Sequence, residues 1–409
     1  MHSSSNPSSV VIAGGSLAGL MHALVLLSLP DAPSVRILER SPTALLHNQG
    51  AGIVAGNEAQ QFFNDYVRPG REIAVTSPRR HYLDRKGEII PDSCQDWPQR
   101  MTSWDLLYHL LRWRVEGLQS PYVEGLQEDV RPKASYENGC TITDISDAGA
   151  DGVRVTYTHI ERGPNQSATA DLFLAADGAS STVRHLLAPE VERSYAGYVA
   201  WRGTVPEDQL SDAAKKVFVE RFTFFHSEGI QILGYLIPGP DGMLERGSRL
   251  FNWVWYCNYP DGSHELDELM TDREGKRHTV TLHVGGIRDG IWTKQKRYAE
   301  SVLPPQFAEV VEKTAQPFVQ AITDVIAPTN AFMDSKVFLV GDALAGFRPH
   351  TAASTGQAAF DALAFGELME GKLGGKEYRQ RVMEFAGRMQ RRGVELGERS
   401  QFGRHPLSG

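Results

Sequence analysis

Cysteine is scarce in this chain of 409 residues, which contains only Cys94, Cys140 and Cys257. Their number is odd, they are far apart and no Cys-x-x-Cys pair occurs, so neither a disulfide framework nor a zinc site is predicted. We therefore expect a reducing, cytoplasmic location and no bound metal.

Basic residues are missing from the start of the chain. Residues 10–29 are apolar enough to be taken for a signal sequence or a membrane helix, but residues 1–9 contain no Lys or Arg, so the positive region of a signal peptide is lacking. Gly14, Gly15 and Gly19 also interrupt the run, where a membrane helix has no need of them. We predict no membrane segment.

The chain as a whole has no excess of basic charge: 42 Lys and Arg residues stand against 50 Asp and Glu residues, a formal net charge of −8. This balance argues against a nucleic-acid partner. With 41% apolar and 22% charged residues, the composition is that of a folded globular protein and excludes disordered, collagen-like and coiled-coil chains.

The hydrophobic pattern at the N-terminus predicts a βαβ unit. The β-branched run at residues 10–13 suits a buried parallel strand, residues 20–29 suit a helix, and residues 35–40 suit a second strand. Further along, Ser103 is a plausible N-cap for a helix that reaches Gly117. Other predicted elements are strands at 153–157, 171–176 and 337–340, an aromatic-rich antiparallel sheet within 195–259, and helices from Ser354 and over 377–399.

The turn between the first strand and helix is rich in glycine: Gly14-Gly15-Ser16-Leu17-Ala18-Gly19. Such a turn lets backbone N–H groups and a helix N-terminus face a pyrophosphate, although Ser16 replaces one glycine of the usual Gly-x-Gly-x-x-Gly fingerprint. Glu39 follows Gly14 by 25 residues, at the end of the second strand, where a carboxylate can bind ribose hydroxyls. The pattern indicates dinucleotide binding; a glycine turn that merely packs is the alternative.

Two further strands end in an acidic residue beside glycine. The first leads into Asp177-Gly178, followed by Ser181 and Arg184, and the second leads into Gly341-Asp342. Each alone is a common turn. Together with the glycine turn, the three patches resemble the signatures of the FAD-dependent aromatic hydroxylases, which have the para-hydroxybenzoate hydroxylase fold. Residues 195–203, 235–239 and 348–350 are similar to the 2,6-dihydroxypyridine 3-monooxygenase branch of that family.

The resemblance implies a Rossmann-like FAD-binding domain and a second domain built on a mostly antiparallel sheet, an α/β protein overall. We predict a discontinuous two-domain architecture, with residues 1–75, 98–190 and 328–409 in the FAD-binding domain and 76–97 and 191–327 in the substrate-binding domain. The implied FAD contacts are the pyrophosphate, ribose, ribityl chain and flavin ring, and the residues that match them are Gly14, Gly15, Ser16, Leu17, Ala18, Gly19, Glu39, Arg40, Arg100, Asp177, Gly341, Asp342, Ser354 and Thr355.

The activity implied is oxygen insertion into a small, electron-rich aromatic substrate of the phenol, hydroxypyridine or hydroxybenzoate type. In this family NADPH or NADH reduces FAD, and O2 then adds at the flavin C4a to give the hydroperoxide that transfers oxygen. Where the attacked carbon bears a carboxylate, the same transfer gives oxidative decarboxylation. The alternatives are an FAD reductase or dehydrogenase without oxygen insertion, a flavin-binding regulator and a plain NAD dehydrogenase. The sequence does not determine the oligomeric state, and the assembly that we consider is a homodimer.

The chemistry needs a dry, largely apolar pocket and a group that hydrogen-bonds the substrate oxygen. Our candidates are His226, Tyr235 and His350, with Pro349 beside the flavin. Arg202 can bind a substrate carboxylate or form a structural ion pair, and we favour the ion pair. Two motifs depart from the family: Gln49-Gly50-Ala51-Gly52-Ile53 lacks an arginine before Ala-Gly, and Gly341-Asp342-Ala343-Leu344-Ala345 lacks a histidine.

Overall fold

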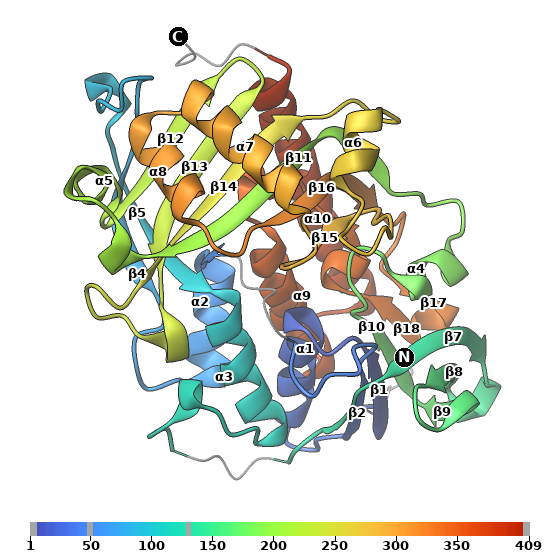
Figure 1. Cartoon of the computed structure of the whole chain (residues 1–409). Coiled ribbons are helices and arrows are strands. Elements are labelled where there is room, and N and C mark those ends of the chain that lie inside the picture. Colours follow the sequence, from blue (N-terminus) through green and yellow to red (C-terminus); the bar gives the residue numbers. More distant parts are fainter. Residues whose placement is uncertain (1–5, 47–51, 128–131, 404–409) are drawn as a thin grey trace.

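The computed structural model describes residues 6–46, 52–127 and 132–403. A six-stranded, mainly parallel sheet forms one part of the molecule and a ten-stranded, mainly antiparallel sheet forms the other (Figure 1). This arrangement confirms the predicted fold class. Within the described residues no helix combines the length and apolar character needed to cross a membrane.

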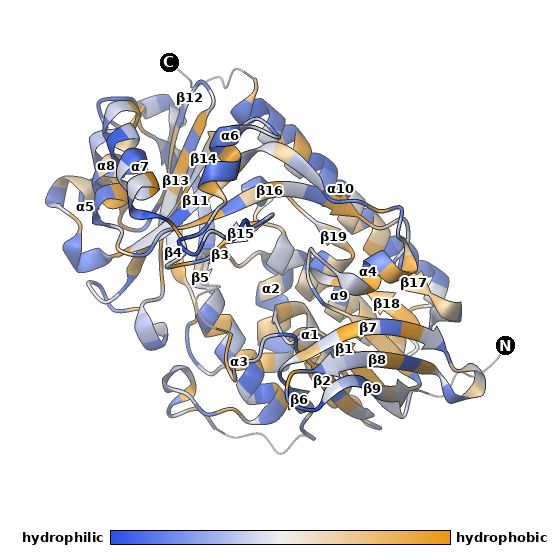
Figure 2. Ribbon diagram, turned by 45° about the vertical axis from the view of Figure 1, so that its right-hand side comes forward, coloured by the Kyte–Doolittle hydropathy of each residue, from blue (hydrophilic) through white to orange (hydrophobic). Residues whose placement is uncertain are grey.

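The six-stranded sheet contains the predicted βαβ unit. The order of the strands in this sheet places the first strand of the chain near the centre, and both of its neighbours run parallel to it. The strands, in sheet order, are β17 (Ala331–Phe332), β18 (Val337–Leu339), β10 (Leu172–Ala175), β1 (Ser9–Ala13), β2 (Ser34–Leu38) and β6 (Ser135–Glu137). Three helices, α1 (Leu17–Leu27), α3 (Trp104–Glu116) and α9 (Ser354–Met369), join these strands in one hydrophobic core. Figure 2 shows hydrophobic residues concentrated in these strands.

Local sequence signals set the bounds of α3. The Ser103 hydroxyl accepts a hydrogen bond from the Leu106 N–H at 3.3 Å, so it caps the helix as predicted. The helix ends at Gly117, whose φ of +82° is readily adopted by glycine.

The ten-stranded sheet gathers strands from several parts of the chain. In order they are β15 (Thr281–Leu282), β16 (Phe318–Ile326), β11 (Ser194–Pro206), β14 (Leu250–Asn258), β13 (Ile230–Ile237), β12 (Arg221–Ser227), β4 (Val75–Tyr82), β5 (Gln95–Ser103) and β3 (Gly52–Val54), and β19 (Ala345–Gly346) pairs with β16 off this path. All its pairs are antiparallel except β12 with β4.

Alternation along β14 divides this sheet into two faces. Trp253 and Trp255 lie in one hydrophobic cluster, while Val254 and Tyr256 lie in another. Helices α5 (Asp212–Phe218), α7 (Asp289–Val302) and α8 (Pro305–Lys313) cover the tryptophan face. The opposite face, with Val254 and Tyr256, is directed into the molecule and borders the cavity described below.

The remaining elements complete the outline. The strands β7 (Cys140–Asp147), β8 (Val153–His159) and β9 (Gly163–Ala170) form a separate antiparallel sheet beside the six-stranded one. The short helices are α2 (Asn57–Phe62), α4 (Thr182–Leu187) and α6 (His264–Leu269). The long helix α10 (Gly375–Gln401) packs against α9 and also reaches β13, β14 and β16 of the large sheet.

Candidate active site

The glycine turn is shaped by close backbone packing. A Cβ on Gly14, whose φ is +98°, would lie 2.3 Å from the Ala176 carbonyl oxygen, and one on Gly19 would lie 2.0 Å from the Gly14 oxygen. A Cβ on Gly15 would lie 2.1 Å from the Tyr136 hydroxyl. Backbone atoms therefore leave no room for a Cβ at Gly14 and Gly19, whereas at Gly15 the Tyr136 side chain would have to move, and the turn holds the start of α1 against the ends of β1 and β10.

The three sequence patches meet in space. The Gly14 turn contacts Ala176, next to Asp177, and a Cβ on Gly341 would lie only 2.7 Å from the Ala18 Cβ. Arg184 joins the two later patches, because its guanidinium donates to the Ala343 carbonyl at 2.8 Å. The expectation that these distant stretches converge is thus confirmed in the fold.

Glu39 lies at the turn, where its carboxylate accepts the Gly15 N–H at 2.8 Å and the Ser41 N–H at 2.7 Å. Ser16 is the N-cap of α1 and makes no capping bond with its side chain among the described residues, so the first N–H groups of the helix have no side-chain cap there. This cradle suits a pyrophosphate and an adjacent ribose, so the residues present fit FAD. Arg40 is exposed just beyond it.

A cavity of about 820 Å³ lies between the ten-stranded sheet, α9 and α10. That volume is in the upper part of the range for small-molecule sites. Asp342 lines the cavity while its neighbour Gly341 packs on Ala18, so the Gly341-Asp342 patch links the glycine turn to the cavity, although residues 14–19 are not among its lining residues. Ser354 and Thr355, at the N-terminus of α9, also line it.

Burial raises the pKa of Asp342, against the opposing effect of the Arg193 guanidinium, the Ser354 hydroxyl and Arg184. Burial likewise raises the pKa of Asp177, whose carboxylate accepts the Ser181 hydroxyl and the Val183 N–H. Asp177 therefore holds the start of α4 and is not among the residues that line the cavity.

Cross-strand registration builds the cavity floor. One row across β11, β14, β13, β12 and β4 places Arg202, Val254, Leu233, Phe224 and Tyr82 opposite one another. The next row in the same face consists of Tyr256, Gln231 and His226. Every one of these side chains lines the cavity. The predicted apolar walls from the aromatic sheet are therefore present.

The substrate-side candidates lie in this cavity. Tyr235 is buried, burial raises its pKa, and its hydroxyl has no hydrogen-bond partner among the described residues. His226 Nε2 accepts a hydrogen bond from Gln231 Nε2 at 3.0 Å, and Ser400 of α10 donates to Gln231 Oε1 at 2.7 Å. His350 follows Pro349 in the turn before α9, and it stacks on Tyr256 with ring centroids 4.3 Å apart.

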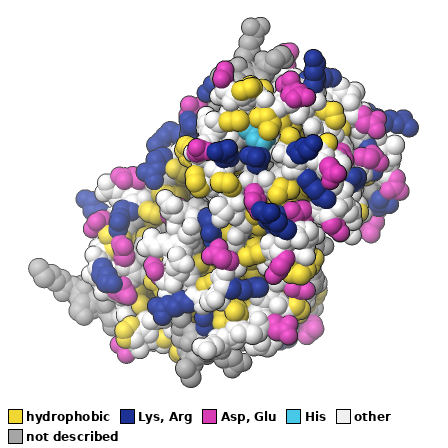
Figure 3. All heavy atoms as spheres, turned by 90° about the vertical axis from the view of Figure 1, so that its left-hand side faces the viewer, with side chains coloured by type: hydrophobic (Ala, Val, Ile, Leu, Met, Phe, Trp, Pro, Cys, Tyr) yellow, Lys and Arg dark blue, Asp and Glu magenta, His cyan; other side chains and the backbone are white. Residues whose placement is uncertain are grey.

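Arg202 forms no ion pair in the part of the chain that the structure describes, which contradicts the favoured prediction. Its guanidinium lies in the cavity, where its charge acts to lower the pKa values of Tyr235 and Tyr256. The cavity lining contains six arginines and two carboxylates, Glu58 and Asp342, among the described residues. In the view of Figure 3, Lys and Arg side chains in the upper part of the molecule are interspersed with hydrophobic ones and a histidine.

Arg100 lies apart from the cradle. Its guanidinium pairs with Glu72, and it is not among the residues that line the cavity. Arg112 of α3 is closer to the cradle: it lies over the Tyr136 ring, 3.6 Å from the centroid, and Tyr136 donates to the Gly15 carbonyl at 3.0 Å. Sequence reasoning missed both residues, because only the fold brings α3 and β6 to the turn. Residues 49–51 of the unusual Gln-Gly-Ala motif lie outside the described residues.

Two residues of α9 hold the Gly-Asp patch. The Asp361 carboxylate accepts the Gly341 N–H at 2.9 Å, and the Gln357 amide donates to the Gly341 carbonyl at 2.7 Å. Burial raises the pKa of Asp361 to about 7. Gln357 and Asp361 are four residues apart, and this i, i+4 spacing places them on one face of α9. The sequence does not show that this face is directed at the Gly341-Asp342 patch, because that depends on how α9 packs.

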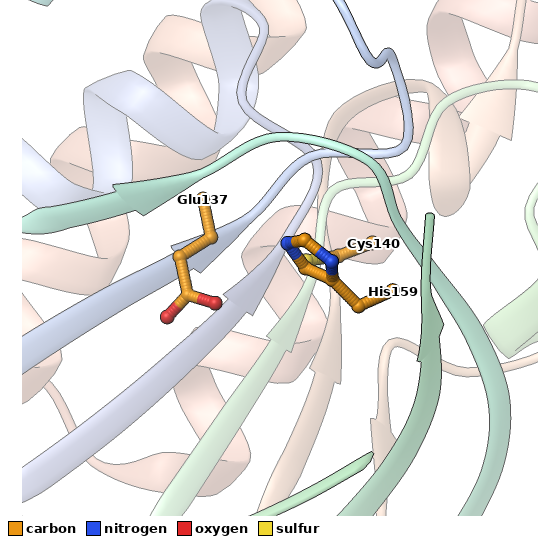
Figure 4. A group of neighbouring side chains, drawn as sticks. All are labelled: Glu137, Cys140 and His159. Atoms are coloured by element: carbon orange, nitrogen blue, oxygen red, sulfur yellow. The ribbon is translucent and has the colours of Figure 1, made fainter. Parts of the chain in front are cut away.

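A group of potential metal ligands lies elsewhere, at the edge between β6, β7 and β8 (Figure 4). It comprises Glu137, Cys140 and His159. Arg36 and Arg162 both form salt bridges with Glu137, at 2.6 and 2.5 Å. Burial raises the pKa of the Cys140 thiol, and His159 Nδ1 accepts two backbone N–H groups. These partners leave the group poorly suited to a cation.

Comparison with known proteins agrees with the site. The family model "FAD binding domain-like" matches residues 195–324. The chain is 29% identical over 401 residues to 2,6-dihydroxypyridine 3-monooxygenase from Paenarthrobacter nicotinovorans, covering 94% of this chain and 92% of the relative. It is 30% identical over 220 residues to FAD-dependent urate hydroxylase from Klebsiella oxytoca, covering 54% of this chain and 47% of that protein.

The solved structure of 2,6-dihydroxypyridine-3-hydroxylase from Arthrobacter nicotinovorans superposes with a TM-score of 0.83 and 26% identity, covering 99% of this chain and 96% of that one. The fold is therefore that of the FAD-dependent hydroxylases of the para-hydroxybenzoate hydroxylase type, and these similarities support an aromatic hydroxylase enzyme. Within that class it resembles the 2,6-dihydroxypyridine 3-monooxygenase branch along almost its entire length.

Proposed function

We propose that this enzyme inserts one oxygen atom from O2 into a small, electron-rich aromatic substrate of the phenol, hydroxypyridine or hydroxybenzoate type, with NADPH or NADH as the reductant. The main support is the position of the Gly341-Asp342 patch, which packs on the glycine turn at Ala18 and lines the aromatic-walled cavity. A single FAD held at the turn would thus present its flavin ring to a substrate in that cavity.

We assign the FAD contacts accordingly. Residues 14–19 would hold the pyrophosphate, Glu39 the adenosine ribose, and Asp342 the ribityl chain or pyrophosphate. The N–H groups at Ser354 and Thr355 would face the flavin ring, since α9 begins in the cavity and has no side-chain cap among the described residues. We assign to Asp177 the role of holding the N-terminal end of α4 next to the site. We place Arg112, rather than Arg100, on the side of the site that would hold the adenosine. Bound FAD supplies the redox chemistry that activates O2.

The floor of the cavity supports an aromatic substrate that lies flat. Val254, Leu233 and Phe224 form an apolar row, and Arg202 stands at one end of it. A ring placed on that row would put a phenolate or carboxylate substituent against Arg202, whose charge lacks an acidic partner among the described residues. Where the carboxylate is on the attacked carbon, loss of CO2 would accompany oxygen transfer.

Tyr235 is the group that we propose to hydrogen-bond the substrate oxygen. Its hydroxyl is available in the cavity, and its raised pKa keeps it protonated, so that it would donate to a substrate anion and stabilise it. His226 is fixed by Gln231 and Ser400, which supports a role in closing one end of the cavity. Burial lowers the pKa of His350 to about 3, so we assign it to positioning as a neutral ring and not to proton donation.

We also propose the predicted division into an FAD-binding domain (1–75, 98–190, 328–409) and a substrate-binding domain (76–97, 191–327). The two sheets support it in outline. Three segments of the proposed FAD-binding domain pair in the ten-stranded sheet and so cross the boundary: β3 (Gly52–Val54), the end of β5 (Gln95–Ser103) and β19 (Ala345–Gly346). The three cysteines are free, which supports a reducing compartment as the location we propose.

The decisive experiment is a panel of phenols, hydroxypyridines and hydroxybenzoates added to the FAD-loaded enzyme with NADH or NADPH. Substrate-stimulated oxidation of the reductant should be accompanied by a product that is heavier by one oxygen, or by one in which hydroxyl replaces the carboxylate. Stimulated oxidation of NAD(P)H with no oxygenated product across the panel would instead identify a reductase and contradict the proposal.

A further inference from the structure

Helix α10 presents one face to the cavity. Its lining residues are Phe385, Arg388, Met389, Arg392, Leu396, Arg399 and Ser400, with spacings of three, one, three, four, three and one residues that place them on one side of a helix. The three arginines on this face are exposed, so their charges stand at the rim of the cavity while the apolar residues between them face inward.

The charge of this arginine row is largely uncompensated. Arg388 lies over the Phe385 ring at 5.4 Å and, like Arg399, has no carboxylate partner among residues 6–46, 52–127 and 132–403. Arg392 alone is paired, with Glu395 one turn away at 3.0 Å and with both side chains exposed. Pairs of this kind contribute little, so Arg392 remains available to a stronger anion.

The row passes beside the turn that precedes α9. A Cβ on Gly393 would lie 3.4 Å from the Arg348 carbonyl oxygen, and one on Gly397 would lie 2.9 Å from the Arg348 Cδ, so the two glycines let α10 approach Arg348 closely. Pro349 follows directly and lines the cavity. Arg388 and Arg399 are eleven residues apart, which corresponds to about 16 Å along a helix.

We propose that Arg388, Arg392 and Arg399 form the docking site for the phosphates of the dihydronicotinamide dinucleotide, with the nicotinamide ring entering the cavity beside Pro349. The inference rests on the proposed function, which requires a reductant. The sequence contains no second glycine-rich dinucleotide turn, so a helix N-terminus is not at hand for this pyrophosphate, and guanidinium groups are its natural substitute. The row supplies the positive charge that phosphate groups require, at the rim of the cavity that the nicotinamide would enter.

The test uses the oxidised, FAD-loaded enzyme and two probes that cannot reduce it, ADP-ribose and NADP⁺. Their dissociation constants are measured by calorimetry for the wild type and for the triple variant Arg388→Gln, Arg392→Gln, Arg399→Gln. We expect at least a tenfold increase for the triple variant and a weaker salt dependence of binding, at unchanged flavin content. Arg391→Gln is the matched control, because Arg391 is exposed on the same helix but does not line this cavity.

The outcomes separate this inference from the proposed function. Equal dissociation constants in the wild type and the triple variant would overturn the docking site, and so would an equal increase for Arg391→Gln. If the triple variant loses FAD, the three single variants replace it, and each must weaken binding of ADP-ribose at full flavin content for the inference to stand. Failure of both NADH and NADPH to reduce the wild-type flavin would instead contradict the proposed function itself.

Discussion

Tyr198 of β11 and His350 of the turn before α9 are hydrogen-bonded, with 3.0 Å between the Tyr198 Oη and the His350 Nε2. The bond joins the ten-stranded sheet to the turn before α9, and Tyr256 stacks on the same imidazole. His350 is therefore held from two directions beside the cavity.

This arrangement predicts the behaviour of His350→Gln. Since burial lowers the pKa of His350 to about 3, the imidazole is neutral above about pH 4 and does not set an ionisation near neutral pH. We expect a severalfold loss of hydroxylation and more H2O2 per NAD(P)H consumed, with the acid limb of the pH profile unchanged. Tyr198→Phe should give the same pattern in a milder form. Disappearance of the acid limb in His350→Gln would show that the imidazole is a proton donor after all.

Tyr235→Phe removes a cavity hydroxyl and leaves the aromatic packing against Phe222 in place. If the hydroxyl stabilises the substrate anion, kcat/KM should fall by about 10²–10⁴-fold while FAD content and Tm stay unchanged. Steady-state kinetics with the best substrate of the panel measure this. The control is Tyr195→Phe, which removes a hydroxyl that donates to the Tyr259 carbonyl away from the cavity lining. Equal losses in the two variants would contradict the role of Tyr235.

Arg202→Gln tests recognition of the anionic group. A buried charge-assisted contact contributes about 1.5–3 kcal/mol, so KM for an anionic substrate should rise by roughly 10- to 100-fold. A neutral analogue that lacks the anionic group should bind equally well to the wild type and the variant. The same increase in KM for both compounds would mean that Arg202 maintains the structure of the cavity floor and does not recognise the anionic group.

Gly341→Ala tests the contact between the glycine turn and the Gly-Asp patch. The added Cβ would meet the Ala18 Cβ at 2.7 Å and the φ of +57° is strained for alanine, so we expect a loss of about 2–4 kcal/mol and protein with little FAD. Gly371→Ala is the control, because Gly371 has a similar φ of +70° with open space around it. Flavin absorbance and thermal unfolding distinguish the two. A yellow, stable Gly341→Ala protein would contradict the tight junction.

The raised pKa of Asp361 predicts that the free energy of unfolding depends on pH and that Asp361→Asn changes this dependence. The pKa of Asp361 is about 7 in the folded state against 3.8 for an ordinary aspartate, so between these pH values the folded protein holds a proton that the unfolded chain lacks. The free energy of unfolding therefore falls as pH rises from about 4 to about 7, by up to about 4 kcal/mol for this group. Asparagine keeps an acceptor for the Gly341 N–H and carries no charge.

We therefore expect Asp361→Asn to be more stable than the wild type at pH 8 and to lose that advantage at pH 5. Urea unfolding at the two pH values measures the difference, and Asp151→Asn, at an exposed position, is the control. An equal destabilisation of Asp361→Asn at both pH values would mean that the carboxylate is needed as an anion.

Sequence patterns predicted the elements that have strong local signals. The glycine turn, the Ser103 cap and the apolar strands appear close to their predicted positions because short-range sterics and side-chain periodicity determine them. The same holds for the aromatic sheet, whose alternation separates Trp253 from Val254.

What the sequence did not predict depends on contacts between distant segments. Arg100 points to Glu72 and Arg112 lies by the turn because of how α3 and β5 pack, which no spacing within either element reveals. Arg202 looked like a structural ion-pair residue because arginine usually is one; only the registration of β11 with β14 shows that it faces the cavity. The support of Gly341 by Asp361 likewise follows from packing of α9 on β18.

The position of α10 in the chain bears on how the enzyme matures. One wall of the cavity is supplied by residues 385–400, so a nascent polypeptide that has emerged only as far as α9 already has its glycine turn and its aromatic floor but still lacks that wall. Domains generally fold from the N-terminal side during synthesis. We therefore expect the cradle for the nucleotide end of FAD to form during synthesis before the chamber that shields the reaction from water, and that chamber to be complete only when the final long helix docks.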